Sequence, residues 1–259
     1  MATFLFEDII FGPVSSRRLG VSLGINLLPN HSKFCNFNCI YCECGWTLKD
    51  QQIRAHFHSR QEVKEALESK LDDMKAKSEP LDVITYAGNG EPTLHPKFSD
   101  IINDTIALRN QYFPEADIAV LSNGTKIGNP IIFNALDKIE KNILKLDAGT
   151  EQTCQLINQP INKFDLSQYV ENLKKFNKKI IIQSLFLKGF VGGNFVDNST
   201  DQEVDAWLKL IKEIEPSLVM IYTYHRDTPA DQLEKISLER LEKIAREVEA
   251  LGIDTQVSE

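Results

Sequence analysis

The sequence predicts an α/β fold, an open and partial (β/α)6 barrel with parallel strands. Six short apolar runs alternate with six amphipathic stretches, which is typical of repeated β-α units. The runs are mostly apolar on both faces until their carboxyl ends, as expected of parallel strands covered by helices. A doubly wound sheet would usually carry a glycine-rich phosphate turn after its first strand, but residues 29–58 form a cysteine-bearing loop there instead. We therefore expect one core domain over residues 1–259, arranged as a partial barrel.

The first half of the chain supplies three strands, predicted at residues 21–28, 83–87 and 118–122. The first helix begins at Ser59, with Glu62 three residues later as a capping box. Asn129 followed by Pro130 begins a short third helix that ends near residue 139. Between them, a second helix places its apolar residues on one face: Phe98, Ile101 and Ile102, with Thr105.

The second half repeats the pattern, with strands predicted at residues 143–147, 180–186 and 218–223. Asp165 caps the fourth helix, and Thr200 with Glu203 forms a second capping box at the start of the fifth. Ser237 begins the last helix. Each strand is thus followed by a helix, which is what a partial barrel requires.

Composition and charge exclude several classes of protein. The chain has 259 residues with 42% hydrophobic and 25% charged residues, an ordinary globular composition. No apolar run approaches the roughly 20 residues that span a bilayer, and the first residues lack a signal-peptide pattern. Twenty-nine basic against 37 acidic residues give a net charge of −8, which disfavours a general nucleic-acid coat. We expect a cytoplasmic protein without membrane partners.

Polar side chains follow the predicted strands at their carboxyl ends, where barrel enzymes place their chemistry. Because these ends meet at one rim, the residues there are candidates for binding: Gly88, Asn89, Gly90, Glu91, Ser122, Asn123, Lys145, Asp147, Gln183, Ser184, Tyr222, Tyr224, His225 and Arg226. Any one of these positions is weak evidence, since turn residues often follow strands. Their joint placement indicates a functional rim.

The cysteine loop is the most specific signal. Cys35, Cys39 and Cys42 place three thiols within one short segment. Structural zinc sites and ordinary iron-sulfur clusters use four protein ligands, so three thiols would leave one metal position open to a ligand. Cys44 provides an alternative, because as a fourth ligand it would close a non-catalytic zinc or iron-sulfur module. Both interpretations stay open from the spacing alone.

The segment Cys-x3-Cys-x-Tyr-Cys resembles the signature of the radical S-adenosylmethionine superfamily, with Tyr41 at its aromatic position. The resemblance implies that Cys35, Cys39 and Cys42 hold a 4Fe-4S cluster, whose fourth iron binds S-adenosylmethionine. Gly90-Glu91-Pro92 is similar to the glycine-glycine-glutamate stretch of that superfamily, which contacts the methionine amino group. Asn89 stands where its first glycine is usual.

Other positions extend the resemblance. Residues at the end of the fourth strand contact the ribose or carboxylate in relatives, which implies this role for Lys145 and Asp147; the alternative is an ion pair that only stabilises the rim. Residues 12–24 and Tyr222-x-Tyr224-x-Arg226 are similar to the branch related to wyosine-base synthases. Those enzymes add a second cluster on three more cysteines, whereas this chain has only Cys44 and Cys154 left. A tRNA substrate is therefore possible but not favoured.

The resemblance implies an enzyme that cleaves S-adenosylmethionine reductively and abstracts hydrogen from a substrate that the sequence does not identify. An external one-electron donor such as a flavodoxin or ferredoxin would supply the electron. Tyr224, His225 and Arg226 are the candidates for substrate contact, Arg226 because a guanidinium can hold a carboxylate or phosphate bidentately. The alternatives within this class are a glycyl-radical activase acting on another protein and a tRNA-modifying enzyme.

Overall fold

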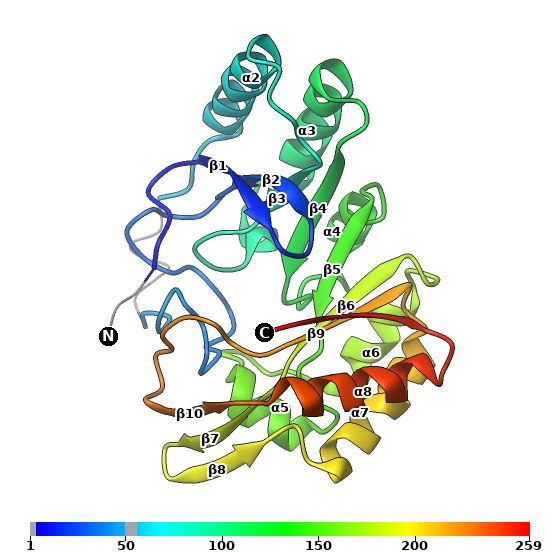
Figure 1. Cartoon of the computed structure of the whole chain (residues 1–259). Helices are drawn as coiled ribbons and strands as arrows, with labels where there is room; N and C mark the ends of the chain where they lie inside the picture. The colour runs from blue at the N-terminus through cyan, green and yellow to red at the C-terminus, as the bar shows by residue number, and fades with distance from the viewer. Residues whose placement is uncertain (1–3, 50–55) are drawn as a thin grey trace.

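The computed structural model describes residues 4–49 and 56–259, which form a curled, mostly parallel sheet covered by helices (Figure 1). The sheet has eight strands in the order β1-β2-β3-β4-β5-β6-β9-β11. β1 pairs with β2 in antiparallel fashion, and every other neighbouring pair is parallel. The partial barrel predicted from the sequence is confirmed.

The six predicted strands are β2 (Gly20–Ile25), β3 (Val83–Tyr86), β4 (Asp117–Ser122), β5 (Lys141–Lys145), β6 (Ile180–Leu185) and β9 (Leu218–Tyr222). The helices between and after them are α2 (Arg60–Ala76), α3 (Phe98–Tyr112), α4 (Pro130–Leu136), α6 (Leu166–Lys174), α7 (Asp201–Ile214) and α8 (Leu238–Glu249), with a short 3-10 helix η1 (Pro92–Leu94) before α3. No helix of the described part of the chain is long and apolar enough to cross a membrane.

The helices begin where their capping residues predict. Ser59 and Glu62 form the full capping box of α2, and the side chains of Asn129, Asp165 and Ser237 accept the first-turn N–H groups of α4, α6 and α8. The box predicted at Thr200 is only half formed, which corrects that prediction. Glu203 donates its N–H to Thr200 but turns its Oε1 to the hydroxyls of Thr150 and Thr153, at 2.6 and 2.8 Å.

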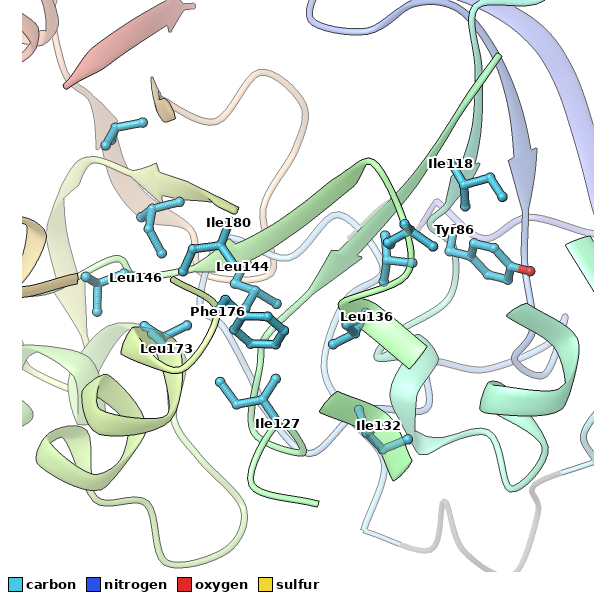
Figure 2. Close-up of a cluster of buried hydrophobic side chains, with 14 of the residues drawn as sticks. Tyr86, Ile118, Ile127, Ile132, Leu136, Leu144, Leu146, Leu173, Phe176 and Ile180 are labelled. Carbon is cyan, nitrogen blue, oxygen red and sulfur yellow. The ribbon is translucent and has the colours of Figure 1, made fainter. Parts of the chain in front are cut away.

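The two faces of the sheet have different roles, because successive side chains of a strand point to opposite sides. The outer face packs against the helices in one apolar core, part of which Figure 2 shows, including Tyr86 and Ile118 from the strands and Leu136, Leu173 and Phe176 from the helical layer. The inner face carries a second, smaller apolar cluster, made of Val83, Ala119, Ile143, Ile181 and Met220. The middle of the inner face is therefore apolar, while Lys145 and Gln183 bring polar groups to it at the strand ends.

Several elements were not predicted. They are β1 (Ile10–Ser16), β11 (Asp254–Ser258), the helix α5 (Glu151–Asn158), and a separate antiparallel sheet of β10 (Gln232–Lys235), β7 (Leu187–Val191) and β8 (Asn194–Asp197). β1 and β11 are the two edges of the main sheet. In Figure 1 the hairpin of β1 and β2 and the end of β11 approach each other across the open side of the barrel, and Arg17 donates to the carbonyl oxygen of Glu259 there.

Candidate active site

The cysteine loop is held against the rim of the barrel by backbone hydrogen bonds from both sides. Phe34 donates to the carbonyl of Asn89 at 2.8 Å and accepts from Glu91 at 3.0 Å, which fixes the start of the loop to the turn after β3. Ile40 donates to the carbonyl of Ile157 at 3.0 Å, which fixes its centre to the end of α5. The loop is thus positioned by two elements that are far apart in the sequence.

A cavity of about 140 Å³ lies between this loop and the strand ends. Cys35, Cys39 and Cys42 line it together with Cys44. Facing them are residues of the rim and of the loop: Lys33, Phe37, Tyr41, Gly88, Gly90, Glu91, Leu121, Ser122, Asn123, Lys145 and Gln183. Among residues 4–49 and 56–259, no three His, Cys, Asp or Glu side chains are grouped to hold a single metal ion.

Nitrogen donors are directed at two of the three sulfurs, those of Cys35 and Cys39. The Nδ2 of Asn123 lies 3.7 Å from the Sγ of Cys35, the Nδ2 of Asn158 lies 3.5 Å from the Sγ of Cys39, and the backbone N of Phe37 lies 3.4 Å from the Sγ of Cys35. Such hydrogen bonds stabilise thiolates and are one means by which proteins tune iron-sulfur clusters. The loop therefore provides the sulfur ligands, while the end of β4, the end of α5 and the loop backbone provide the donors that favour their charged form.

The electrostatics of the loop depend on Lys33, which is 3% exposed and donates to the carbonyl of Gly45 at 3.1 Å. Burial by itself lowers the pKa of Lys33, but the adjacent thiols, Cys42 first, outweigh it and raise the pKa. Burial raises the pKa of Cys35 to about 12. Cys42 has its pKa lowered to about 5, first because Cys44 hydrogen-bonds to it and further because Lys33 is near. The positive charge of Lys33 therefore lies beside the sulfurs that carry negative charge as thiolates.

Glu91 joins the turn after β3 to the end of β4. Its Oε1 accepts from the Oγ of Ser122 at 2.8 Å and from the backbone N of Thr93 at 3.0 Å, and its Oε2 accepts from the backbone N of Asn123 at 2.6 Å. The side chain is 2% exposed, and this burial raises its pKa. Glu91 therefore fixes the rim while its carboxylate stays at the wall of the cavity.

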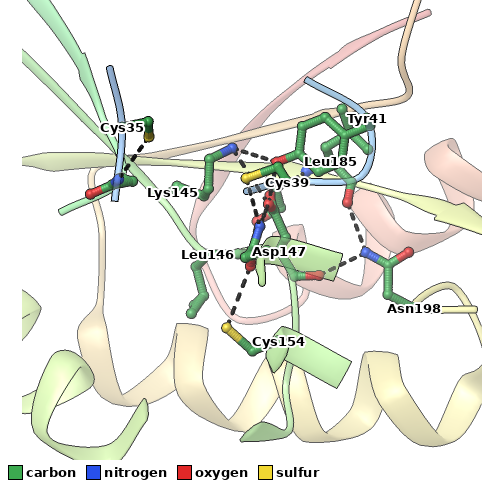
Figure 3. Close-up of polar contacts among 12 residues, drawn as sticks. Cys35, Cys39, Tyr41, Lys145, Leu146, Asp147, Cys154, Leu185 and Asn198 are labelled. Carbon is green, nitrogen blue, oxygen red and sulfur yellow. Dashed lines mark hydrogen bonds and ion pairs between the residues drawn. The ribbon is translucent and has the colours of Figure 1, made fainter. Parts of the chain in front are cut away.

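Asp147 is the centre of a buried polar network (Figure 3). Its Oδ2 accepts from the hydroxyl of Tyr41 and from the Nδ2 of Asn158 at 2.7 Å, and its Oδ1 accepts from the backbone N of Leu185 at 3.0 Å. The ammonium of Lys145 lies 3.4 Å from the same carboxylate and 2.6 Å from the hydroxyl of Tyr41. Burial lowers the pKa of Lys145, but Asp147 outweighs it and raises the pKa overall. The ion pair considered from the sequence is present.

The geometry corrects the prediction that Lys145 and Asp147 share a strand. β5 ends at Lys145, so strand alternation does not place Asp147. The two side chains meet because the chain turns there, with Asp147 fully buried and Lys145 reaching the cavity. Asp147 therefore does not line the cavity, but it holds the side chains of Tyr41 and Lys145, which do.

Three other predicted site residues also turn away from the cavity. The Asn89 side chain bonds to the backbone of Phe6 and Pro29. Ser184 donates to the carbonyl of Leu146 at 2.5 Å and accepts from the indole of Trp207 at 3.2 Å, on the helix side of β6. Arg226 pairs with Glu43 at 2.7 Å and lies over the ring of Phe4. These contacts join the three side chains to other parts of the protein and not to the cavity.

A second cavity of about 340 Å³ adjoins the first, and the two share Tyr41, Cys42, Cys44, Leu121 and Gln183 in their walls. It extends to the open side of the barrel, where its further lining residues are Arg17, Arg18, Glu43, Leu185, Tyr222, Thr223, Tyr224, His225, Ser258 and Glu259. Tyr224 donates its hydroxyl to the carbonyl of Leu233 at 2.7 Å. Tyr224 and His225 thus lie where predicted, beside the cysteine loop.

Two residues of the site were missed in the sequence. Lys33 lies in the loop but before the first cysteine, and a lone lysine carries no signal of its own. Asn158 comes from the unpredicted helix α5, which is capped by Thr150. The pattern of Thr150 with the apolar Cys154 and Ile157 could have indicated that helix. Cys154 itself is buried, as predicted.

The comparison with known families settles the class of protein. The family model described as the radical SAM superfamily matches residues 29–211, which contain the cysteine loop and most of the barrel. The chain belongs to the radical SAM superfamily.

Relatives of known sequence are similar over most of this chain. The GTPase Obg of Brachyspira hyodysenteriae is 30% identical over 241 residues, which are 93% of this chain and 33% of that protein. The UPF0026 protein MJ1312 of Methanocaldococcus jannaschii is 28% identical over 239 residues, 91% of this chain and 70% of that protein. The radical SAM chain thus spans about a third of the first relative.

Solved structures share the fold of this radical SAM protein. A radical SAM methyltransferase from Sphaerobacter thermophilus has a TM-score of 0.67 at 13% identity, over 92% of this chain and 65% of its own. Streptococcus suis SuiB bound to S-adenosylmethionine has a TM-score of 0.59 at 12% identity, over 88% and 46%. Archaeal TYW1, a wyosine synthase, has a TM-score of 0.52 at 14% identity, over 88% and 71%. At these identities the likeness is one of fold.

Proposed function

We propose that this protein is an enzyme that cleaves S-adenosylmethionine reductively at a 4Fe-4S cluster held by Cys35, Cys39 and Cys42. The observation that carries the proposal is the convergence of these three cysteines on one cavity at the rim of a radical SAM barrel. When bound, the cluster and one electron from an external donor such as a flavodoxin or ferredoxin convert S-adenosylmethionine to methionine and the 5′-deoxyadenosyl radical, which takes a hydrogen atom from the substrate.

The residues present suit such a cluster. Thiolates are its usual ligands, and the amide N–H groups of Asn123 and Asn158 are directed at two of the sulfurs. Lys33 places a buried cation beside the thiols, which offsets the negative charge of a thiolate-bound cluster. The cysteine loop is also largely shielded from water, since Cys35, Cys39 and Tyr41 are each less than a tenth exposed.

The rim would hold the rest of the cofactor. Glu91 and Asn123, at the ends of β3 and β4, offer a carboxylate and amide groups to the ammonium and carboxylate of the methionyl part. Lys145 and Gln183 lie on the inner face of the next two strands and offer donors to the ribose hydroxyls. SuiB, which shares the fold, was solved with S-adenosylmethionine bound.

The barrel interior has a second task, which is to exclude water and stray hydrogen donors around a reactive intermediate. Below the rim, Ile143, Ile181 and Met220 form an apolar part of the inner wall, whose only side-chain heteroatom is the weakly accepting sulfur, and the hydroxyls of Ser22 and Thr85 on neighbouring strands bond to each other at 2.8 Å. A substrate would enter through the larger cavity, past Tyr224 and His225.

The test compares two cysteine variants. Wild type, Cys39→Ala and Cys154→Ala are purified without oxygen, reconstituted with iron and sulfide, and supplied with dithionite and S-adenosylmethionine. We expect 5′-deoxyadenosine from wild type and from Cys154→Ala, because Cys154 is a buried thiol outside the loop that donates at 3.4 Å to the Oδ1 of Asn158 and not to the Nδ2 that faces Cys39. Cys39→Ala should lose the cluster absorbance and the product. Product formation by Cys39→Ala with full iron content would refute the proposal.

Cys44 distinguishes the enzyme from a closed metal module. Its Sγ donates to the carbonyl of Gly88 at 3.5 Å and it lines the same cavity as the three cysteines. The proposal expects Cys44→Ala to retain four irons per chain within error, whereas a fourth ligand would make that variant lose metal. Iron and zinc analysis of the anaerobically purified variant measures this.

A further inference from the structure

Arg18 lies at the entrance to the barrel, and its guanidinium has no acceptor in the part of the chain that the structure describes. It lies in the turn between β1 and β2, where Ser16 Oγ accepts the N–H groups of Arg18 and Leu19 at 3.4 and 3.2 Å. The side chain is half-buried and its Cζ lies 4.9 Å from the ring centroid of Tyr222. Its Nη1 is sealed from solvent and has no hydrogen-bond partner within residues 4–49 and 56–259. A buried donor of this kind normally finds an acceptor.

The charged neighbours of Arg18 are engaged elsewhere. Arg17 donates to the carbonyl of Glu259, and the carboxylate of Glu43 is taken by Arg226 at 2.7 Å. Among the residues that the structure describes, no carboxylate pairs with Arg18. Arg17 and Arg226 therefore have acceptors, whereas the guanidinium of Arg18 keeps N–H groups that are able to bind a ligand.

The position of Arg18 places its guanidinium in the wall of the larger cavity. Arg18 and Tyr222 both line the cavity of about 340 Å³, which continues past Gln183 and Cys42 into the cavity of the three cysteines. An anion bound to Arg18 would therefore belong to a molecule that reaches toward the cysteine loop. The turn that carries Arg18 is anchored to Asp82, whose Oδ2 accepts from the backbone N of Val21 at 2.7 Å, so the guanidinium has a fixed base.

We propose that Arg18 binds a carboxylate group of the substrate at the open side of the barrel. A planar guanidinium matches a carboxylate bidentately through its Nε and Nη2 edge, which, unlike Nη1, is not sealed from solvent, and its Cζ rests against the ring of Tyr222. A monoanionic carboxylate is favoured over a phosphate dianion because, among the described residues of this cavity wall, Arg17 and Glu43 already have partners and Arg18 is left with a single positive charge to offset. The identification of the bound molecule as substrate rests on the proposed function, whereas the anion site itself does not.

The test uses butanoate as the probe, with butanamide as its neutral counterpart and inorganic phosphate as the alternative anion. Binding to the full-length, cluster-reconstituted protein is measured by ligand-observed NMR titration, for wild type, Arg18→Met and Arg60→Met. Arg60 is the matched control because it pairs with Asp104 on the surface and does not line the cavity. We expect butanoate to bind wild type and Arg60→Met, and Arg18→Met to bind it about tenfold or more weakly.

Stability separates this role from a structural one. Since Nη1 has no acceptor, replacing Arg18 with an apolar side chain of similar length removes a buried unsatisfied donor. The melting temperature of Arg18→Met should therefore stay the same or rise, and a fall of several degrees would overturn the proposal. Equal binding of butanoate by Arg18→Met, equal binding of butanamide by wild type, or tighter binding of phosphate would overturn it as well.

The result of the butanoate titration does not depend on the result of the S-adenosylmethionine cleavage experiment. If wild type binds butanoate through Arg18 but forms no 5′-deoxyadenosine with an intact cluster, the proposed function fails and the anion site stands. If 5′-deoxyadenosine forms but wild type does not bind butanoate, only the role of Arg18 fails.

Discussion

Asp147→Ala is expected to lower the free energy of unfolding by about 3–5 kcal/mol, because it leaves an uncompensated charge in the interior. The carboxylate is fully buried and is the counter-ion of Lys145, whose side chain is 14% exposed. Its removal also deprives Tyr41, Asn158 and the N–H of Leu185 of their acceptor. Urea unfolding followed by circular dichroism would measure the loss.

The same variant should weaken the cysteine loop. Tyr41 belongs to the loop, and Asn158 donates both to Asp147 and to the Sγ of Cys39. Without Asp147 both side chains lose their common acceptor and keep only their contacts with Lys145 and Cys39, so we expect less iron per chain after reconstitution than in wild type. Full iron content in a destabilised Asp147→Ala would show that the network supports the barrel alone.

Asp137→Ala is the control for this prediction. Asp137 also pairs with a lysine, Lys179, at 3.3 Å, but the two side chains are 38% and 66% exposed. Exposed ion pairs contribute between zero and about 1 kcal/mol, so its unfolding midpoint should barely change. An equal loss in both variants would mean that burial of the Asp147 network does not matter.

The regular part of this fold could be predicted because local rules agree with the global structure. Runs such as Ile180–Leu185 begin with three isoleucines and are buried on both faces, and side chains such as Ser59 and Asp165 mark helix starts. β11 was missed because Asp254–Ser258 is short and largely polar, as edge strands often are. Its place in the sheet comes from pairing with β9, which the local sequence does not encode.

The site was predicted at the level of the rim but not of individual side chains. Gln183 and Ser184 are consecutive residues of β6, so only one of them can face the interior; it is Gln183, while Ser184 bonds to Trp207. Treating both as cofactor ligands neglected the period of the strand. Asp147 is different, because its partners Tyr41 and Asn158 come from segments that only the folded chain brings together.

Gly90→Ala should remove the contact on which the start of the cysteine loop depends. A Cβ at Gly90 would lie 1.9 Å from the carbonyl oxygen of Phe34, a backbone atom that cannot move without the loop, and the residue has a φ of +138°. Phe34 and Gly90 form a parallel bridge at this point. We expect a loss of about 3 kcal/mol or more from strain and overpacking together, with iron content after reconstitution reduced in parallel.

Gly192→Ala separates the two causes of that loss. Gly192 also has a positive φ, of +55°, but nothing lies within 4 Å of a Cβ built there. This variant should therefore pay only the backbone strain, about 1 kcal/mol, and keep its full iron content. If Gly90→Ala were no worse than Gly192→Ala in unfolding and in iron content, the close approach of Phe34 would not be what positions the loop. The difference between the two variants thus measures how tightly the turn after β3 fixes Cys35 at the rim.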